Sequence, residues 1–276
     1  MEYEYGEYKN YMTVGHAADV VCIKHIHRQI EIVLVTEGTL EMLYQDKILT
    51  VPERSAVLIP SYTMHSFTNR RHHSVCIMEY PQESVGFFHD FLKSTRCSDP
   101  VLPLDDALYA YELSRLPAQR DVSHRIPDAL AQAILNPLCY AFITHCVFEP
   151  TNQPCDDTVI RALNLISNHF DQSITLSGTA EALGIRPETL TRNFREHTGM
   201  TFWDFVLTQR VIYAMTLLRR GRSITEAAFE AGFNSLRSFN RTFMQKTGQT
   251  PSAFLKTKSD GLYDLYEPEF IGLHRK

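Results

Sequence analysis

The chain has 276 residues, of which 44 % are hydrophobic, which is enough for two hydrophobic cores, so we expect two domains. Its formal net charge of −5 is divided unevenly: residues 1–150 hold 12 Lys and Arg against 19 Asp and Glu, whereas residues 157–258 hold 13 against 8. This division excludes the acidic first half as a nucleic-acid-binding region and favours the basic second half. No run of about 18–20 apolar residues predicts a membrane span, and the acidic N-terminus has no apolar run of secretory length. We therefore expect a cytoplasmic protein.

The six cysteines are scattered along the chain without a Cys-x-x-Cys pair. In a reducing cytosol such cysteines are expected to be buried thiols, and a redox sensor is the alternative.

Short β-rich runs separated by turn signals fill residues 19–80. The runs are Val20–Ile23, Ile30–Val35, Leu40–Tyr44, Ser55–Ile59 and Ser74–Met78. Turn signals such as Glu37-Gly38 lie between them. Many short strands at this spacing favour a small antiparallel barrel or jelly roll.

Two histidines and a carboxylate lie at odd spacing in this region. In an extended strand His25 and His27 point to one face, and so does Glu31. With His65 from a partner strand, three imidazoles and a carboxylate would converge inside the barrel. Such a set suits a divalent Fe, Mn, Ni or Zn ion. We favour the alternative, in which these residues bond one another or a small molecule without a metal.

The same residues resemble the signatures of the cupin barrel. His25-Ile-His27, Glu31 and Gly38 resemble the first signature, and Pro60, Tyr62, His65 and Asn69 resemble the second, with Arg54 and Tyr62 where glycines would stand. The resemblance implies a cupin-like barrel that binds a small-molecule effector, such as a sugar or an organic acid. The implied effector residues are His25, His27, Glu31, Tyr62 and His65. No cofactor is expected, and a divalent metal on the histidines and Glu31 is the alternative.

After Pro81 the apolar spacing becomes helical over residues 82–95, 105–116 and 125–149, with a kink expected at Pro137. These helices carry more apolar surface than one small barrel needs. We therefore expect them to join two chains into a homodimer, the alternative being that they only cover the barrel. Residues 150–156 are polar and contain two prolines, which predicts a linker.

The last third of the chain contains one helix-turn-helix pattern twice. Ala180 and Gly184 in the first copy correspond to Ala228 and Gly232 in the second, 48 residues later. In each copy the small residue allows two helices to approach, and the glycine can turn the chain in the left-handed conformation. Two such units in one chain favour a protein that reads DNA.

The second helix of each unit has a buried and an outer face. Leu190 and Phe194 share the buried face in the first unit, as do Phe239 and Phe243 in the second. The predicted DNA-contacting residues are Glu188, Thr191, Arg192, Arg195, Leu236, Arg237, Asn240 and Arg241. Arg can bind guanine bidentately and Asn can bind adenine. A helical bundle with a solvated arginine face is the alternative, which two matching copies disfavour.

A long helix is predicted between the two units, from Thr201 to Arg220. Its length of about 30 Å is close to the spacing of successive major grooves, about 34 Å, so it can hold two recognition helices in adjacent grooves. Thr201 with Asp204, and Ser223 with Glu226, resemble capping boxes.

Residues 157–257 resemble the DNA-binding domain of the AraC/XylS family of transcription regulators. The most specific matches are Ala227–Phe233 and Ser238–Phe243, and the family's base-facing positions fall on the residues named above. One departure is Arg186-Pro187, where the family has a capping residue. The resemblance implies a DNA-binding regulator, not an enzyme, that binds promoter DNA and, if it activates, RNA polymerase. A metal-dependent cupin enzyme, or a metal or redox sensor, fused to a DNA-binding domain is the alternative.

The expected organisation is therefore an α+β multidomain chain. A cupin-like barrel or jelly roll with appended helices occupies residues 1–149 and binds effector and a second chain. The linker (150–156) leads to an all-α domain with two helix-turn-helix units (157–258), and a tail (259–276) follows.

Overall fold

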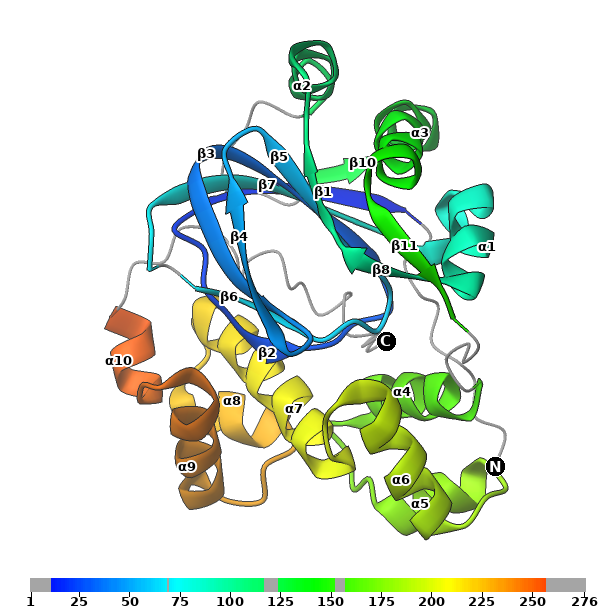
Figure 1. The fold of residues 1–276 in the computed structure, drawn as a ribbon. Helices are drawn as coiled ribbons and strands as arrows, with labels where there is room; N and C mark the ends of the chain where they lie inside the picture. The colour runs from blue at the N-terminus through cyan, green and yellow to red at the C-terminus, as the bar shows by residue number, and fades with distance from the viewer. Residues whose placement is uncertain (1–10, 69, 117–123, 152–156, 257–276) are drawn as a thin grey trace.

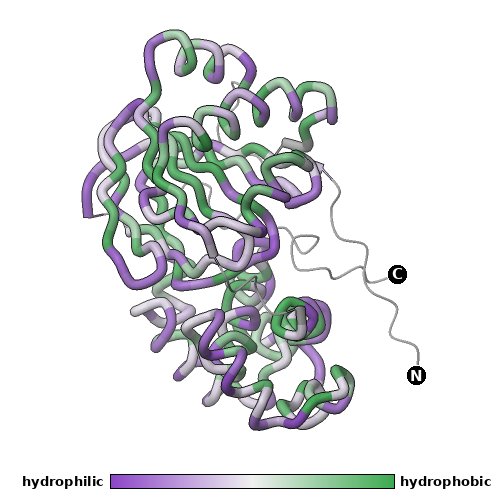
Figure 2. The backbone as a smooth tube through the Cα atoms, turned by 45° about the vertical axis from the view of Figure 1, so that its right-hand side comes forward, coloured by the Kyte–Doolittle hydropathy of each residue, from purple (hydrophilic) through white to green (hydrophobic). Residues whose placement is uncertain are grey.

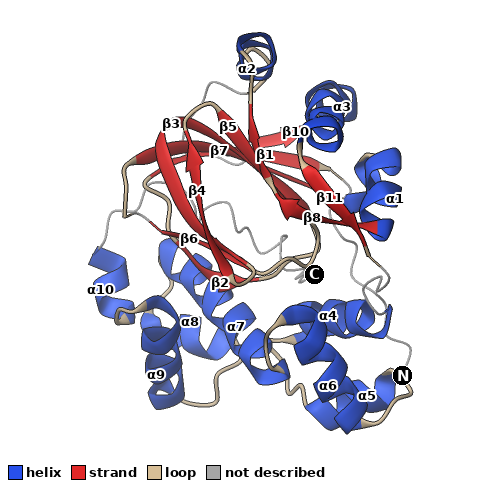
Figure 3. Ribbon diagram, in the orientation of Figure 1, coloured by secondary structure: helices blue, strands red, loops and turns tan. Residues whose placement is uncertain are grey.

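A computed structural model describes residues 11–68, 70–116, 124–151 and 157–256. A β-rich N-terminal part, here called the β-domain (residues 11–151), packs against an all-helical part, the helical domain (residues 157–256; Figures 1 and 3). The predicted class, a β-sheet domain followed by a helical domain, is confirmed. Within the described residues, no helix is both long and apolar enough to cross a membrane.

The β-domain is a rolled antiparallel sheet. Its strands are β1 (Met12–Ala18), β2 (Cys22–His25), β3 (Ile30–Tyr44), β4 (Lys47–Pro52), β5 (Ser55–Ile59), β6 (His65–Thr68), β7 (His73–Tyr80), β9 (Val101–Pro103) and β10 (His124–Ile126). The main path runs β10-β1-β7-β3-β5-β9, while β4 and β6 also pair with β3, and β2 pairs with β6. A second, two-stranded sheet joins β8 (Thr95–Asp99) to β11 (Val147–Pro150).

Strand β3 connects the two layers of the roll. Its first part, Glu31–Val35, pairs with β5 and β7, and its last part, Thr39–Tyr44, pairs with β4. The turn predicted at Glu37-Gly38 is wrong, because the strand continues there with a bulge. Gly38 has φ 72°, and a Cβ atom on it would lie 2.2 Å from the carbonyl oxygen of His72, so only glycine fits this bend.

The first part of β3 is buried on both faces. Ile30, Ile32 and Leu34 belong to a core between the sheet and the helices outside it. Val33 and Val35 belong to the core inside the roll. The tube in Figure 2 is accordingly green, meaning hydrophobic, along much of the sheet. Glu31 alternates with Ile30 and Ile32 and therefore lies on the inner face.

The helices predicted after Pro81 are present but shorter. A 3₁₀ turn (Gln82–Ser84) and α1 (Gly86–Ser94) replace the single helix predicted over 82–95, and α2 spans Asp106–Leu113. α3 (Asp128–His145) continues through Pro137, but it ends before the predicted residue 149, because Val147–Pro150 pairs with β8. Residues 152–156 of the predicted linker and the whole predicted tail lie outside the described residues.

The helical domain contains both predicted helix-turn-helix units. Its helices are α4 (Asp157–His169), α5 (Leu176–Ala182), α6 (Pro187–Thr198), α7 (Phe202–Arg219), α8 (Ile224–Glu230), α9 (Leu236–Thr247) and α10 (Pro251–Lys256). α5 and α6 form the first unit, α8 and α9 the second, and α7 lies between them (Figure 1). In the second turn Gly232 has φ 84°, and a Cβ atom there would lie 2.6 Å from the Asp171 carbonyl oxygen. The turn therefore needs the glycine that the pattern indicated.

Candidate nucleic-acid interface and ligand site

Helices α6 and α9, here called the recognition helices, each have one buried and one exposed face. Leu190 and Phe194 of α6, and Phe239 and Phe243 of α9, are all 0 % exposed. The predicted DNA-contacting residues are all exposed: Glu188, Thr191, Arg192, Arg195, Leu236, Arg237, Asn240 and Arg241. Their side chains are therefore available to a DNA duplex, and their individual contacts stay predictions.

The exposed arginines of the recognition helices are not paired with carboxylates in the part of the chain that the structure describes. Among the described residues, Arg192, Arg195, Arg237 and Arg241 form no ion pair with a carboxylate. Unpaired guanidinium groups on an exposed helix face can bind phosphate oxygens or the edges of bases. The thirteen positive charges of residues 157–258 thus include four that face solvent from the recognition helices.

The two recognition helices begin differently. α9 starts at Ser235, whose hydroxyl accepts a hydrogen bond from the Ser238 amide, whereas α6 starts at Arg186 without any side-chain cap. Pro187 is the first residue of α6, where a backbone N–H would have no partner within the helix. Proline's lack of that N–H therefore costs nothing at this position.

The linking helix α7 has 18 residues and is therefore about 27 Å long. It lies between the two units and separates the recognition helices (Figure 1). Ser223 and Glu226 form the predicted capping box at the next helix. At α7 only half of the predicted box is present: Thr201 accepts from the Asp204 amide, while the Asp204 carboxylate binds the Thr201 hydroxyl and Lys246.

In the β-domain, the three predicted histidines and Glu31 converge where β2, β3 and β6 meet. His25 ends β2, His65 begins β6 directly opposite it, and Glu31 lies at the start of β3. The imidazole centroids are 4.2 Å apart for His25 and His65, and 5.0 Å apart for His27 and His65. Glu31 Oε2 lies 2.8 Å from His27 Nε2 and 3.3 Å from His65 Nε2. We call these four residues the histidine cluster.

Burial and mutual charge shift the titration of the histidine cluster. Burial lowers the pKa of His25 well below its usual value, and the nearby His65 and His27 add to this effect. Burial also opposes the charge on His27, but the hydrogen bond and charge of Glu31 outweigh it and raise the His27 pKa. Conversely, burial would raise the pKa of Glu31, but hydrogen bonds from His27 and His65 hold it well below its usual value. Glu31 thus favours the charged form of His27, 2.8 Å away, while burial favours the neutral form of His25.

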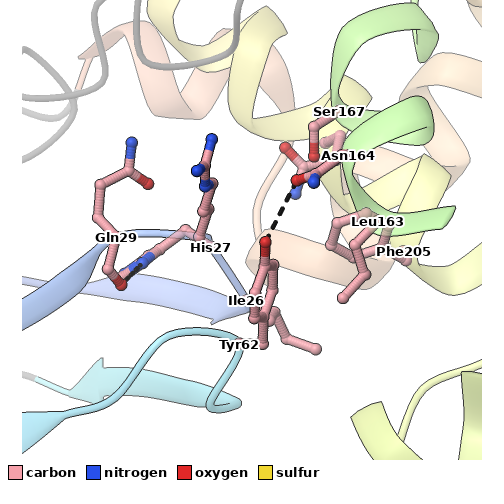
Figure 4. A pocket seen from close by; sticks show the side chains of 10 residues that line it. Ile26, His27, Gln29, Tyr62, Leu163, Asn164, Ser167 and Phe205 are labelled. Carbon is pink, nitrogen blue, oxygen red and sulfur yellow. Dashed lines mark hydrogen bonds between the residues drawn. The ribbon is translucent and has the colours of Figure 1, made fainter. Parts of the chain in front are cut away.

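Tyr62, also predicted to bind effector, lines a cavity with His27 and bonds the helical domain. Its hydroxyl donates a 3.2 Å hydrogen bond to Asn164 Oδ1 of α4 (Figure 4). Tyr62 and Arg54, which stand where the cupin-like pattern has glycine, have φ of 61° and 62°. The backbone at both positions is therefore left-handed, the conformation that glycine adopts most readily. Asn69, the last residue of that pattern, lies outside the described residues.

A small cavity lies between the two domains, next to the histidine cluster (Figure 4). Its volume is about 40 Å³. The β-domain contributes His27, Arg28, Gln29 and Tyr62, and the helical domain contributes Asn164, Ser167 and Gln209. Except for His27 and Tyr62, the polar members were not predicted, because no local pattern joins residues more than 100 positions apart.

A second, open cleft of about 520 Å³ lies on the β-domain beside α3. It is lined by Arg28, Glu83, Asp128 and Gln132 among others, and the sequence pattern did not indicate it either. Arg28 lines both hollows, and its guanidinium forms a 2.6 Å ion pair with Glu83.

Two family models match successive parts of the chain. Residues 11–109 match an AraC-like ligand-binding domain, and residues 179–257 match a helix-turn-helix domain. Together they cover more than half of the chain.

Curated relatives are also regulators, although the chain covers only a small part of each. It is 40 % identical over 90 residues to the HTH-type transcriptional regulator RipA of Corynebacterium glutamicum, covering 33 % of this chain and 27 % of RipA. It is 32 % identical over 124 residues to an uncharacterized HTH-type transcriptional regulator of Staphylococcus aureus, covering 42 % of this chain and 17 % of that protein.

Among solved structures, the fold is similar over nearly its whole length to ToxT of Vibrio cholerae. One ToxT structure matches with a TM-score of 0.63 and 10 % identity, covering 89 % of this chain and 98 % of ToxT. ToxT with a bound unsaturated fatty acid matches with a TM-score of 0.60 and 14 % identity, covering 90 % and 96 %. At this identity the likeness shows the fold. Together with the two family models, it shows that the chain belongs to the AraC family of transcription regulators, with a ligand-binding domain followed by a DNA-binding helix-turn-helix domain.

Proposed function

We propose that the chain binds promoter DNA through α6 and α9 and that a ligand of the histidine cluster changes this binding. The observation that carries the proposal is the position of the segment from β2 to Gln29. Ile23 and Ile26 of this segment are buried in the core of the helical domain, at 9 % and 1 % exposed. His25 and His27, which alternate with them, belong to the histidine cluster.

A ligand that moved the histidines would therefore move two side chains packed in the DNA-binding domain. A second contact joins the two domains: Tyr62 and Met64 pack on the same core, and the Tyr62 hydroxyl bonds Asn164. A ligand shifts the domain arrangement only through different affinities for the two arrangements. Direct packing between the ligand site and the helical domain provides such a difference.

We propose regulation rather than catalysis as the role of the histidine cluster. A regulatory role is supported by the family assignment and by the helix-turn-helix domain that follows in the same chain. The protein is expected to act in the cytoplasm and, as an activator, to contact RNA polymerase. The fatty acid bound to ToxT supports a small ligand in a fold of this kind, and a sugar or organic acid is the corresponding class here.

We further propose a homodimer formed through the helices of the β-domain. Most apolar side chains of α1 and α3, including Phe88, Leu138 and Phe142, pack on the sheet instead of facing outward. The outward apolar surface is carried by Phe87, Tyr140 and Val147, at 52 %, 65 % and 56 % exposed. Sedimentation velocity of the full chain tests this proposal, and a monomer at micromolar concentration would contradict it.

The ligand response is tested by paired measurements on full-length variants. The double variant His27→Ala, His65→Ala should lose the response of a reporter strain screened across carbon sources and metal salts, while purified protein without ligand keeps its DNA affinity. The matched control is His73→Ala, a buried histidine of β7 outside the cluster. If the double variant loses DNA affinity as well and the control does not, the histidines hold the fold and the ligand site lies elsewhere.

A further inference from the structure

The turn of the second helix-turn-helix unit packs closely on the segment 170–172 that precedes the first unit, here called the joint loop. A Cβ atom on Gly232, in that turn, would lie 2.6 Å from the Asp171 carbonyl oxygen. The corresponding glycine of the first unit, Gly184, has φ 70°, but a Cβ atom on it would meet nothing within 4 Å. Both glycines thus suit a left-handed turn, and of the two Gly232 also lets the backbone of the joint loop come this close.

Arg210 of the linking helix α7 binds the same joint loop. Its Nε donates a 2.7 Å hydrogen bond to the Phe170 carbonyl oxygen, and its Nη2 donates one of 3.0 Å to the Gln172 carbonyl oxygen. Its guanidinium carbon also lies 5.9 Å from the centre of the Phe233 ring, next to Gly232. Arg210 therefore contacts the joint loop and the second turn from the helix that lies between the two units.

The chemistry of arginine suits this position. A planar guanidinium carries five N–H donors in a rigid fork, so it can bond two carbonyl oxygens at once in a fixed geometry. The Arg210 side chain is partly buried, and a buried charge is costly unless it is hydrogen-bonded. Burial lowers the pKa of the guanidinium, and the nearby Asp171 carboxylate opposes that effect. The two carbonyl oxygens of the joint loop thus stabilise a charge that water solvates only in part.

The joint loop is attached to α7 by a side chain as well. Phe170 is 0 % exposed, and its ring centre lies 5.7 Å from that of Tyr213, one helical turn after Arg210. The helix before the joint loop, α4, carries Asn164, which bonds Tyr62 of the β-domain. The joint loop therefore follows the helix that contacts the β-domain and packs on the turn of the second unit.

A duplex that is read by two helices restricts the distance and the angle between them. Each additional base pair moves the second half-site by about 3.4 Å and rotates it by about 34–36°, because a turn of DNA holds 10–10.5 base pairs over about 34–36 Å. Loss of the bidentate contact of one helix weakens binding by about 5–150-fold. A rigid joint between the two units therefore selects one spacing of half-sites, whereas a loose joint tolerates several.

We propose that Arg210 is a positioning residue that fixes α9 relative to α6 and thereby sets the spacing of half-sites that the chain binds. The inference rests on the proposed DNA binding through α6 and α9 and adds what determines its spacing. Arg210 is not one of the predicted base contacts, and it acts through the joint loop and the turn at Gly232.

The test compares two duplexes: one that the unaltered full chain selects from a random library, and the same duplex with one base pair inserted between the half-sites. The unaltered chain should bind the second duplex at least about 10-fold more weakly. Arg210→Met keeps an unbranched side chain but loses both hydrogen bonds, and it should reduce this ratio to below about 3-fold. A general loss of stability or of positive charge would weaken both duplexes alike and leave the ratio unchanged.

Arg161→Met is the matched control, because it removes the same charge from an exposed position of α4. It should keep the ratio of the unaltered chain. Arg210→Lys keeps the charge without the planar fork, so its ratio should lie between those of the unaltered chain and Arg210→Met. The proposal is overturned if Arg210→Met, shown to be folded by circular dichroism, keeps the ratio of the unaltered chain, or if Arg161→Met lowers the ratio as much.

The distance between the recognition helices provides a readout without DNA. Spin labels are attached to cysteines at Glu196 of α6 and Gln245 of α9, exposed positions outside the predicted DNA contacts, in a full chain whose Cys146 and Cys155 are replaced by serine. Double electron–electron resonance should give one narrow distance distribution for the otherwise unaltered chain. Arg210→Met, or Arg210→Lys if the methionine variant does not fold, should broaden it. An unchanged distribution overturns the proposal.

The two readouts together separate this proposal from the proposed function. If the chain selects no duplex but the Arg210 variants broaden the distance distribution, the positioning role stands and the proposed function fails. If the chain binds its selected duplex and Arg210→Met changes neither the ratio nor the distribution, the proposed function stands and the positioning role is overturned.

Discussion

The two domains bury different kinds of polar side chain. Among the described residues, every buried histidine or carboxylate lies in the β-domain: His25, Glu31, His65, His73, Glu79 and Glu112. The helical domain buries only uncharged polar side chains: Thr179, Thr198, Thr208, Gln209, Thr216 and Thr242. Several of these threonines bond the carbonyl one turn earlier in their own helix, as Thr198 does with Phe194 at 2.6 Å.

This difference indicates that the two domains respond to different conditions. Burying an ionisable group costs free energy unless it is paired, bound or held in its neutral form, so the protonation of these six groups is coupled to the folding of the β-domain. The helical domain instead places its charges on the exposed faces of α6 and α9. We therefore expect pH and ligands to act on the β-domain and ionic strength to act on the helical domain.

The largest effect that we expect from this comparison is a loss of stability with rising pH, caused by Glu112 of α2. Glu112 is 0 % exposed, and both of its carboxylate oxygens lack a hydrogen-bond partner among the described residues. Burial raises the pKa of Glu112 from 4.5 to about 8, against a smaller opposing effect of Arg115. The folded chain thus holds a proton that the unfolded chain releases above pH 4.5. Stability should fall by up to about 1.4 kcal/mol per pH unit from there to pH 8.

Chemical denaturation of the full chain at pH 5 and pH 8 measures this effect. Glu112→Gln, which cannot ionise, should lose less stability between the two values than the unaltered chain. Glu181→Gln, at an exposed position of α5, should behave like the unaltered chain. If Glu112→Gln kept the pH dependence of the unaltered chain, the buried carboxyl would have no effect on stability, and the difference between the two domains would have no energetic consequence.

Local patterns predicted the helical domain better than the β-domain. The helix-turn-helix units rest on short-range spacing of glycine, small and aromatic residues, which the chain itself specifies within about twenty residues. In the β-domain, β1, β4 and the short strands β8–β11 were not predicted, β6 was predicted only as the strand that carries His65, and β3 was divided in two. Their pairing depends on partners far away in the sequence, such as Met12 with Ile126, which no local pattern contains.

The same limit applies to the candidate ligand site. Alternation correctly placed Glu31 on the inner face and brought the histidines together, although His27 lies beyond the end of β2. It could not indicate that Tyr62 turns toward Asn164, or that Glu79 lies opposite Glu31, since both depend on how distant elements pack. Which exposed side chains contact a base likewise depends on the bound duplex, which no local pattern contains.

The smaller effect concerns base contacts from the recognition helices. Arg241 of α9 and Arg192 of α6 each follow a buried residue by two positions, so they project alike from their helices. Loss of a bidentate base contact costs about 1–3 kcal/mol. Arg241→Ala should therefore weaken binding to a selected duplex by about 5–150-fold at physiological salt, and Arg192→Ala should have an effect of the same kind.

Arg237 and Arg195 provide the contrast within the same two helices, because we expect them to bind phosphate. A phosphate contact contributes about one unit to the slope of log affinity against log salt and little sequence discrimination. Arg237→Ala should flatten that slope for selected and random duplexes equally, whereas Arg241→Ala should weaken the selected duplex more than the random one. Fluorescence anisotropy across a salt series distinguishes the two. If Arg241→Ala only flattened the slope, the arginines of α9 would supply general attraction, and sequence would have to be read by Asn240 and Leu236.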